Sequence, residues 1–274
     1  MKNKDCLITV LKGLWIGGTM TVPGVSGGSM AMITGIYDRL IFAVSSFFKD
    51  PKGNALFLAR FVAGAAVGML LFARAISALF ETPANIPVRF FFLGAVAGGV
   101  PMIFKEAGVR KVDIRSVFWV AAGVCLVLSL SFLPAGLFGP GGGAAGVLLQ
   151  LAGGVIIAVG LVLPGISVSH MLYMLGIYDT MMEQIGSLDI LPLIPLGIGT
   201  VGGIVLTTRI LERLMKGYPQ VTYLIILGFM FGSLPELFPG IPSGITLIFS
   251  VLSALLGFGC LYAMSRREAA GGER

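Results

Sequence analysis

A Pro-Gly break inside an apolar segment occurs twice in this chain, each time in the same sequence context. The first copy is VPGVSGGS at residues 22–29 and the second is LPGISVSH at 163–170; GIYD follows at 35–38 and again at 176–179, so both motifs recur 141 residues later. Proline and glycine interrupt helices. Membrane proteins tolerate such interruptions where the freed backbone is buried in protein or lines a cavity. The duplicated break therefore predicts a membrane protein of two related halves, each exposing polar backbone at the corresponding place.

The composition supports a membrane location for the whole chain. Its 274 residues are 56% hydrophobic and only 12% charged, whereas a soluble domain carries about 25% charged residues. We therefore predict an all-α integral membrane protein with a single transmembrane domain, residues 1–274. The net charge of +6 is carried by loops, which fits membrane topology and argues against nucleic-acid binding. Three scattered cysteines and a single histidine form no disulfide or zinc pattern, so we expect no metal and no cofactor.

Each half is predicted to contain one broken segment followed by three membrane spans. Residues 1–12 are expected to form a short basic arm, repeat 1 to cover about 13–133, and repeat 2 about 147–265. The arm between residue 13 and the first break is about 15 Å long as a helix, too short for a hydrocarbon core about 30 Å thick. We therefore predict a re-entrant helical hairpin; the longer arms of the second copy leave two full crossings open. The predicted spans are 56–79, 88–104, 116–133, 190–211, 221–234 and 245–264.

The duplication extends past the breaks and predicts that the second half is inverted. Residues 93–104 resemble 227–238 at a spacing of 134, and Arg74 aligns with Arg209. Three spans are an odd number, so the second half starts on the opposite face. Nearly all Lys and Arg residues fall in the N-terminus, the C-terminus and three loops on one side, and the loops on the other side contain only Arg89. Because positive loops face the cytoplasm, we predict an inverted-topology repeat with both termini cytoplasmic.

The residues after each break are candidates for an anion site. A helix that starts there presents unpaired N–H groups at the positive end of its dipole, and such ends bind phosphate. Two ends entering from opposite faces would form a nearly symmetric pocket near the midplane, as in alternating-access transporters. The alternative is a packing kink in which serine bonds back to the helix. The candidates are Ser26, Gly27, Gly28 and Ser29 in the first copy and Ser167, Ser169 and His170 in the second.

Charged residues near the breaks are further candidates. Arg74 and Arg209 are costly near hydrocarbon and need a partner, either an anionic ligand or a carboxylate, unless they extend to the interface. Asp38 and Asp179, placed at the end of the second arm of each hairpin, could couple transport to protons or pair with these arginines; the alternative is a polar hairpin end near the interface. Tyr37 and Tyr178 fit interfacial anchors at least as well as ligand contacts.

The paired motifs PGVSGGS…GIYD and PGISVSH…GIYD, together with the two-hairpin layout, resemble the bacterial and archaeal polyprenyl-phosphate transporter family. The resemblance covers essentially the whole chain and is most specific over residues 17–40. It implies a plasma-membrane protein that returns undecaprenyl phosphate, the lipid carrier of cell-wall sugars, from the outer to the inner leaflet. Where the first hairpin has Gly27-Gly28-Ser29, the second has Val168-Ser169-His170, so the two ends are not expected to act equally.

Two other functions compete with this one. Undecaprenyl-pyrophosphate phosphatases also look similar, but they place an arginine beside the serine of the motif and a pair of acids in the first hairpin. Neither motif here contains an arginine, and no glutamate precedes the break in either hairpin, so we expect a protein that is not an enzyme and has no catalytic residues. The second alternative is a carrier of a small anion driven by H⁺ or Na⁺.

Overall fold

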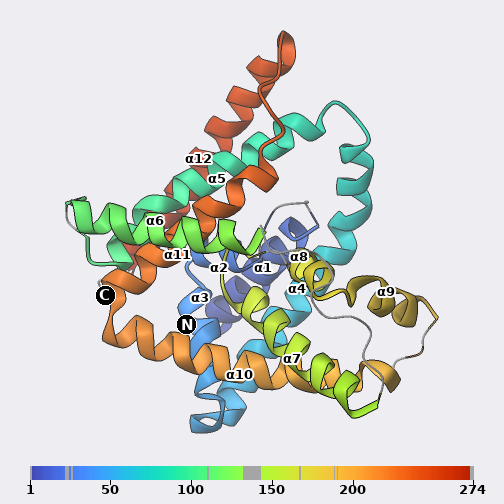
Figure 1. Cartoon of the computed structure of the whole chain (residues 1–274). Coiled ribbons are helices and arrows are strands. Elements are labelled where there is room, and N and C mark those ends of the chain that lie inside the picture. Colours follow the sequence, from blue (N-terminus) through green and yellow to red (C-terminus); the bar gives the residue numbers. More distant parts are fainter. Residues whose placement is uncertain are drawn as a thin grey trace.

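In the computed structural model, which describes residues 2–21, 25, 27–109, 111–131, 143–166, 168–187, 189 and 191–271, all regular structure is helical. The all-helical prediction is therefore confirmed for these residues (Figure 1). Single 3-10 turns lie at Phe47–Lys49 and Leu191–Leu193. The α-helices are α1 Lys2–Thr19, α2 Gly27–Ile33, α3 Tyr37–Ser45, α4 Pro51–Phe80, α5 Asn85–Glu106, α6 Ile114–Ser131, α7 Gly143–Val162, α8 Val168–Leu175, α9 Tyr178–Gly186, α10 Ile194–Gly217, α11 Pro219–Leu237 and α12 Ile245–Gly271.

Within the described part of the chain, five helical segments are long and apolar enough to cross a membrane, and they match five of the six predicted spans. They are Pro51–Phe80, Asn85–Glu106, Leu191–Gly217, Pro219–Leu237 and Ile245–Ala263. The span predicted at 116–133 corresponds to α6, whose apolar stretch Ile114–Ser129 is shorter; residues 132 and 133 lie outside the described part. The chain is thus a multi-pass helical membrane protein.

The first arm is longer than its sequence predicted. The expected basic arm at 1–12 is wrong for residues 2–12, because they form the first turns of α1. At 18 residues, this helix extends about 27 Å. Its early turns are held by α4, since Gly64 lies directly against the backbone of Val10. The residues predicted to form a separate basic arm are therefore part of the helix that leads to the first break.

The GIYD motif is a second break, and it works in the same way in both copies. Gly35 has φ 66° and Gly176 has φ 70°, a left-handed conformation that favours glycine. The Ile36 N–H donates to the Ala31 carbonyl at 3.0 Å and the Ile177 N–H to the Leu172 carbonyl at 3.2 Å, as in a Schellman cap. A new helix then starts. Asp38 and Asp179 therefore lie in the first turn of α3 and α9, which corrects their predicted place at the end of the arm and suits a carboxylate.

Helix boundaries recur at the spacings found in the sequence. Helices α3 and α9 start at Tyr37 and Tyr178, which are 141 residues apart. Helix α11 starts 134 residues after α5, and each contains one internal proline, Pro101 and Pro235, again 134 residues apart. The same local sequence signals thus act twice along the chain.

Glycines bring helices into backbone contact in four pairs. Helix α1 packs on α4, α7 on α10, α5 on α12 and α6 on α11 (Figure 1), and such small-residue contacts are typical of membrane helices. Within each pair, residue numbers rise together, so the two helices run parallel. The contacts that show this are Gly64 with Val10 and Gly68 with Leu14; Gly199 with Leu151 and Gly203 with Val155; Gly94 with Ala254 and Gly98 with Phe258; and Gly123 with Ile225 and Gly232 with Val127.

Candidate functional site

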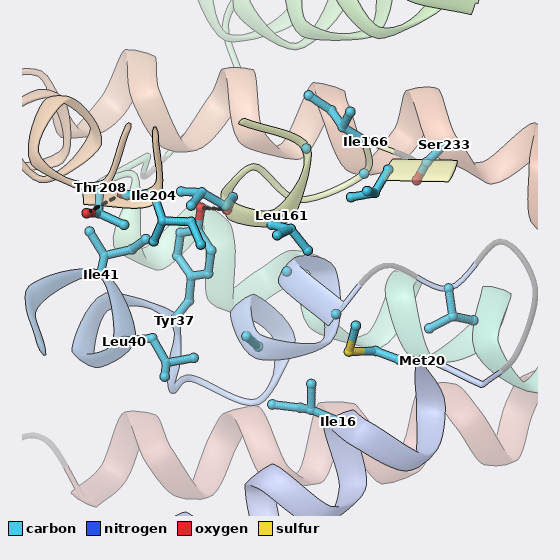
Figure 2. Close-up of a pocket in the computed structure, with 18 of the residues that line it drawn as sticks. Ile16, Met20, Tyr37, Leu40, Ile41, Leu161, Ile166, Ile204, Thr208 and Ser233 are labelled. Carbon is cyan, nitrogen blue, oxygen red and sulfur yellow. Dashed lines mark hydrogen bonds between the residues drawn. The ribbon is translucent and has the colours of Figure 1, made fainter. Parts of the chain in front are cut away.

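A cavity of about 500 Å³ lies where the two broken segments meet. Gly27 and Gly28, at the start of α2, line it from the first half, and Gly165, Ile166 and Val168 line it from the second break. Helices α1, α3, α4, α7, α10 and α11 supply the remaining walls. Figure 2 shows side chains from both halves converging on this space.

The start of α2, which follows the first motif, touches the second Pro-Gly break. A Cβ at Gly28 would lie 3.1 Å from the Cα of Pro164, so the start of α2 packs against the second Pro-Gly break. Gly165 has φ 81° and lies directly against the backbone of Phe229 in α11. Only glycine fits such a backbone conformation in such close contact. The glycines of the motifs therefore allow the two breaks to share one cavity.

Tyr37 joins α3 to α7 beside this cavity. Its hydroxyl donates a hydrogen bond of 2.6 Å to the carbonyl oxygen of Val162, at the end of α7. The side chain is only 3% exposed and points from α3 towards α7 (Figure 2). The interpretation of Tyr37 as an interfacial anchor is therefore wrong, because the ring is buried between the halves.

The cavity lining is mainly apolar, with a few polar groups. Thr208 and Ser233 line it, and their hydroxyls donate to carbonyls one turn back in their own helices, at 2.7 Å and 2.8 Å. Glu236 is the only charged side chain among the described residues of the lining. An anion in this space would therefore meet backbone N–H groups and hydroxyls rather than a lysine or arginine of the described lining.

The predicted anion-binding residues divide into three groups. Gly27 and Gly28 line the cavity. Ser29 is 4% exposed, and its hydroxyl is buried without a hydrogen-bond partner among the described residues. Ser26 and Ser167 lie outside the described residues; the backbone of Ser169 and His170 belongs to α8, but their side chains are outside the described part.

The structure does not bring the paired arginines to the cavity. Thr208 lines it, so Arg209 points about 100° away around α10; its Nε instead donates to the Ser45 carbonyl at 3.3 Å. On α4 the lining residue is Phe61, and Arg74, 13 residues later, faces about 220° away and is exposed. Contact between either arginine and phosphate stays a prediction.

The paired aspartates also lie outside the lining. Asp38 accepts a 2.6 Å hydrogen bond from the hydroxyl of Tyr223 in α11, while Asp179 is exposed on α9. Sequence reasoning missed Tyr223, Thr208, Ser233 and Glu236, because nothing in their local pattern distinguishes them from other residues of a span. The described residues contain no cluster of three potential metal ligands.

Comparison with known proteins identifies the family. Residues 16–247 match the model of the VCA0040-like family, described as undecaprenyl phosphate translocase-like. The chain belongs to this family. It is also similar to a polyprenyl-phosphate transporter of Vibrio cholerae, with 30% identity over 87% of this chain and 79% of that protein. A polyprenyl-phosphate transporter of Staphylococcus aureus is 31% identical over 92% of this chain and 93% of that protein. No solved structure matches the chain.

Proposed function

We propose that this protein carries a polyprenyl phosphate, with undecaprenyl phosphate as the expected substrate, from the outer to the inner leaflet of the plasma membrane. The observation that carries the proposal is one cavity that is lined both by Gly27 and Gly28, which follow the first Pro-Gly break, and by Gly165 of the second break. Broken helices at the interface of two repeats are where transporters bind their substrates. The apolar walls suit the first part of an isoprenoid tail, and the polar backbone suits its phosphate. The two relatives are both polyprenyl-phosphate transporters, and this similarity supports the substrate class.

The phosphate is proposed to lie beside Gly27 and Gly28, with N–H groups at the start of α2 and α8 as donors. The hydroxyl of Ser29, next to Gly28, is buried and has no hydrogen-bond partner among the described residues, which is costly and is consistent with a polar ligand near the start of α2. Ser26, Ser167, Ser169 and His170 belong to the same proposed site. We assign Arg74 and Arg209, which do not line the cavity, to the approach of the phosphate from either side.

We propose re-entrant hairpins, and the parallel helix pairs support broken segments that begin and end on the same side of the membrane. Helix α1 runs parallel to α4 and in contact with it, so both begin on the same side. The intervening helices α2 and α3 must then return the chain to the side where α1 began. The parallel pair of α7 and α10 supports a hairpin in the second half as well.

The same pairs support an inverted repeat. Short connections at 81–84 and 107–113 join α4, α5 and α6, so successive spans alternate in direction and α6 runs opposite to α5. Helix α12, the counterpart of α6, nevertheless runs parallel to α5. A repeat that kept its orientation would make that pair antiparallel. With positive loops inside, we propose that both termini lie in the cytoplasm.

Depletion of the protein in cells tests the function and its direction. Undecaprenyl phosphate should accumulate on the outer face and become accessible to an antibiotic that binds it from outside. Unchanged exposure in a strain without a second carrier would contradict the proposal. Uptake of inorganic phosphate by vesicles containing the protein, driven by H⁺ or Na⁺, would favour the small-anion carrier instead, and release of phosphate from a pyrophosphate lipid would favour hydrolysis.

A further inference from the structure

The two hairpins have related sequences but different packing. Helix α3 of the first hairpin packs on α10 of the second half and on α4. Arg209 and Glu212 of α10 both bind Ser45 at its end. Among the described residues, helix α9 packs mainly on its own neighbours, α8 and the 3-10 turn at Leu191–Leu193, and Figure 1 shows it at the edge of the molecule. One hairpin is therefore docked on the opposite half and its counterpart is not.

Two hydrogen bonds fasten the docked hairpin, and we call them the inner latch. Tyr37 donates to the Val162 carbonyl at 2.6 Å, and Asp38 accepts from Tyr223 at 2.6 Å. Each bond joins the first half to the second. A third bond joins α1 to the turn after α2, where the Lys12 ammonium donates to the Thr34 carbonyl at 2.6 Å. The latch thus lies on the side of the basic N-terminal segment.

The repeat assigns a counterpart to every member of this latch. At the spacing of 141, Tyr37 corresponds to Tyr178, Asp38 to Asp179 and Val162 to Thr21; at the spacing of 134, Tyr223 corresponds to Arg89. The starts of the helices that carry them recur at the same spacings. A mirrored arrangement would therefore bring the Tyr178 hydroxyl to the Thr21 carbonyl and the guanidinium of Arg89 to the carboxylate of Asp179.

The chemistry of this mirrored set is complementary, although it is not identical. A guanidinium replaces the tyrosine hydroxyl as the donor to the aspartate, and arginine with a carboxylate gives a strong charge-assisted pair. In the present structure Arg89 donates to the Glu236 carbonyl at 3.4 Å and lies 5.3 Å from the centre of the Phe80 ring, while Asp179 is exposed on α9. Arg89 and Asp179 thus correspond by the repeat to Tyr223 and Asp38, which already form a hydrogen bond between the halves.

We propose that Arg89 and Asp179 form an outer latch in a second conformation, in which α9 docks on the first half and the inner latch is broken. Tyr178 and the Thr21 carbonyl complete it. The two latches then alternate: the inner latch closes one side of the cavity in the first conformation, and the outer latch closes the other side in the second. Arg89 and Asp179 are positioning residues, because they hold hairpins and do not touch substrate. The inference rests on the inverted repeat of the proposed function.

Cysteine cross-linking measures the second conformation directly. Cys6, Cys125 and Cys260 are replaced by alanine, and the pair Arg89→Cys and Asp179→Cys is oxidised in membranes, with Arg89→Cys and Asp189→Cys as a matched control pair. We expect a disulfide in the first pair and little in the control. Tyr37→Phe, which weakens the inner latch, should raise the initial rate of cross-linking severalfold, up to about tenfold, as a shift in a two-state equilibrium requires. A rate equal to that of the control pair, or one that Tyr37→Phe does not raise, would overturn the outer latch.

Charge reversal provides a test that does not depend on cysteine chemistry. Arg89→Asp and Asp179→Arg should each slow lipid-phosphate transport, and the double variant should recover most of the rate, since the pair is restored with opposite polarity. A merely structural role for either residue predicts no such recovery. Exposed Arg115 supplies the control. Arg115→Asp alone should leave transport unchanged, and adding it to Asp179→Arg should not restore the transport rate. If the wild type transports but a folded double variant does not recover the rate, the latch is rejected and the transport function stands. If the wild type itself does not transport, the function is rejected.

Discussion

Gly28 of the first Pro-Gly motif lies against Pro164 of the second, since a Cβ added to Gly28 would lie only 3.1 Å from the proline Cα. The two motifs are 141 residues apart, so this contact joins the halves at the edge of the shared cavity. A side chain here would push the breaks apart or fill the cavity. The geometry therefore makes Gly28 more sensitive to substitution than Gly27, where an added Cβ would meet the flexible side chain of Met20.

Substitution of Gly28 tests the shared cavity. Gly28→Ala should slow transport, because the neighbouring Pro164 backbone must yield, and Gly28→Leu should abolish it. The matched control is Gly197 on α10, where an added Cβ meets nothing within 4 Å; Gly197→Ala and Gly197→Leu should transport normally. Transport rates in reconstituted vesicles check this, and normal transport by Gly28→Leu would contradict the placement of substrate beside the two breaks.

Gly165 should be required for stability through steric contact as well as through its backbone conformation. A residue with a Cβ in the left-handed region costs about 1–2 kcal/mol, and contact with the Phe229 backbone adds about 1–3 kcal/mol of overpacking. Gly240 has φ 88° and nothing within 4 Å of an added Cβ, so Gly240→Ala isolates the first effect. Thermal unfolding in detergent should show a larger loss for Gly165→Ala, and equal losses would remove the proposed contact with α11.

The hydroxyl of Tyr37 should stabilise the docked hairpin. Tyr37→Phe removes a hydrogen bond and leaves the Val162 carbonyl buried, which costs about 1–3 kcal/mol. Tyr262, 37% exposed near the end of α12, is the control, and Tyr262→Phe should change little. The midpoint of thermal unfolding measures both. Identical midpoints for the two variants would show that the bond between α3 and α7 does not contribute.

The start of α6 should weaken in acid. The Asp113 carboxylate accepts hydrogen bonds from the backbone N–H and hydroxyl of Ser116, at 2.8 Å and 2.7 Å, and these bonds lower the pKa of Asp113. Because the folded pKa is the lower one, the stabilisation is complete above the ordinary carboxyl pKa and is lost as the pH falls through the folded value. Asp113→Asn should therefore reduce the dependence of stability on pH below about 4, as measured by unfolding across a pH series; an unchanged dependence would contradict the cap.

The sequence predicted what depends on local signals and missed what depends on packing. Hydrophobic length located five spans, and the repeated PG motifs located the breaks beside the cavity. The first arm was predicted too short, because residues 1–12 were interpreted as a separate basic arm, whereas residues 2–12 belong to α1. The GIYD motif was not recognised as a break, although Gly35 and Gly176 were visible as glycines that could cap a helix.

Side-chain direction was the harder part of the site. Arg74 and Arg209 were chosen because a charge in an apolar segment needs a partner, but a helix turns by about 100° per residue, and sequence alone does not say which face meets the cavity. Thr208, adjacent to Arg209, lines the cavity instead. Tyr223 meets Asp38 from 185 residues away in sequence, and a contact of that range leaves no local signal.

Transbilayer movement of a reporter lipid measures the central claim most directly. Vesicles of defined phospholipid carry a fluorescent polyprenyl phosphate in both leaflets, and a membrane-impermeant quencher added outside reports how much reaches the outer leaflet. With the wild-type protein, or with Gly197→Leu, nearly all of the fluorescence should be quenched with time. With Gly28→Leu, or without protein, only the fraction that starts in the outer leaflet should be quenched. Vesicles with wild-type protein that behave like empty vesicles, or a Gly28→Leu variant that behaves like wild type, would contradict the account.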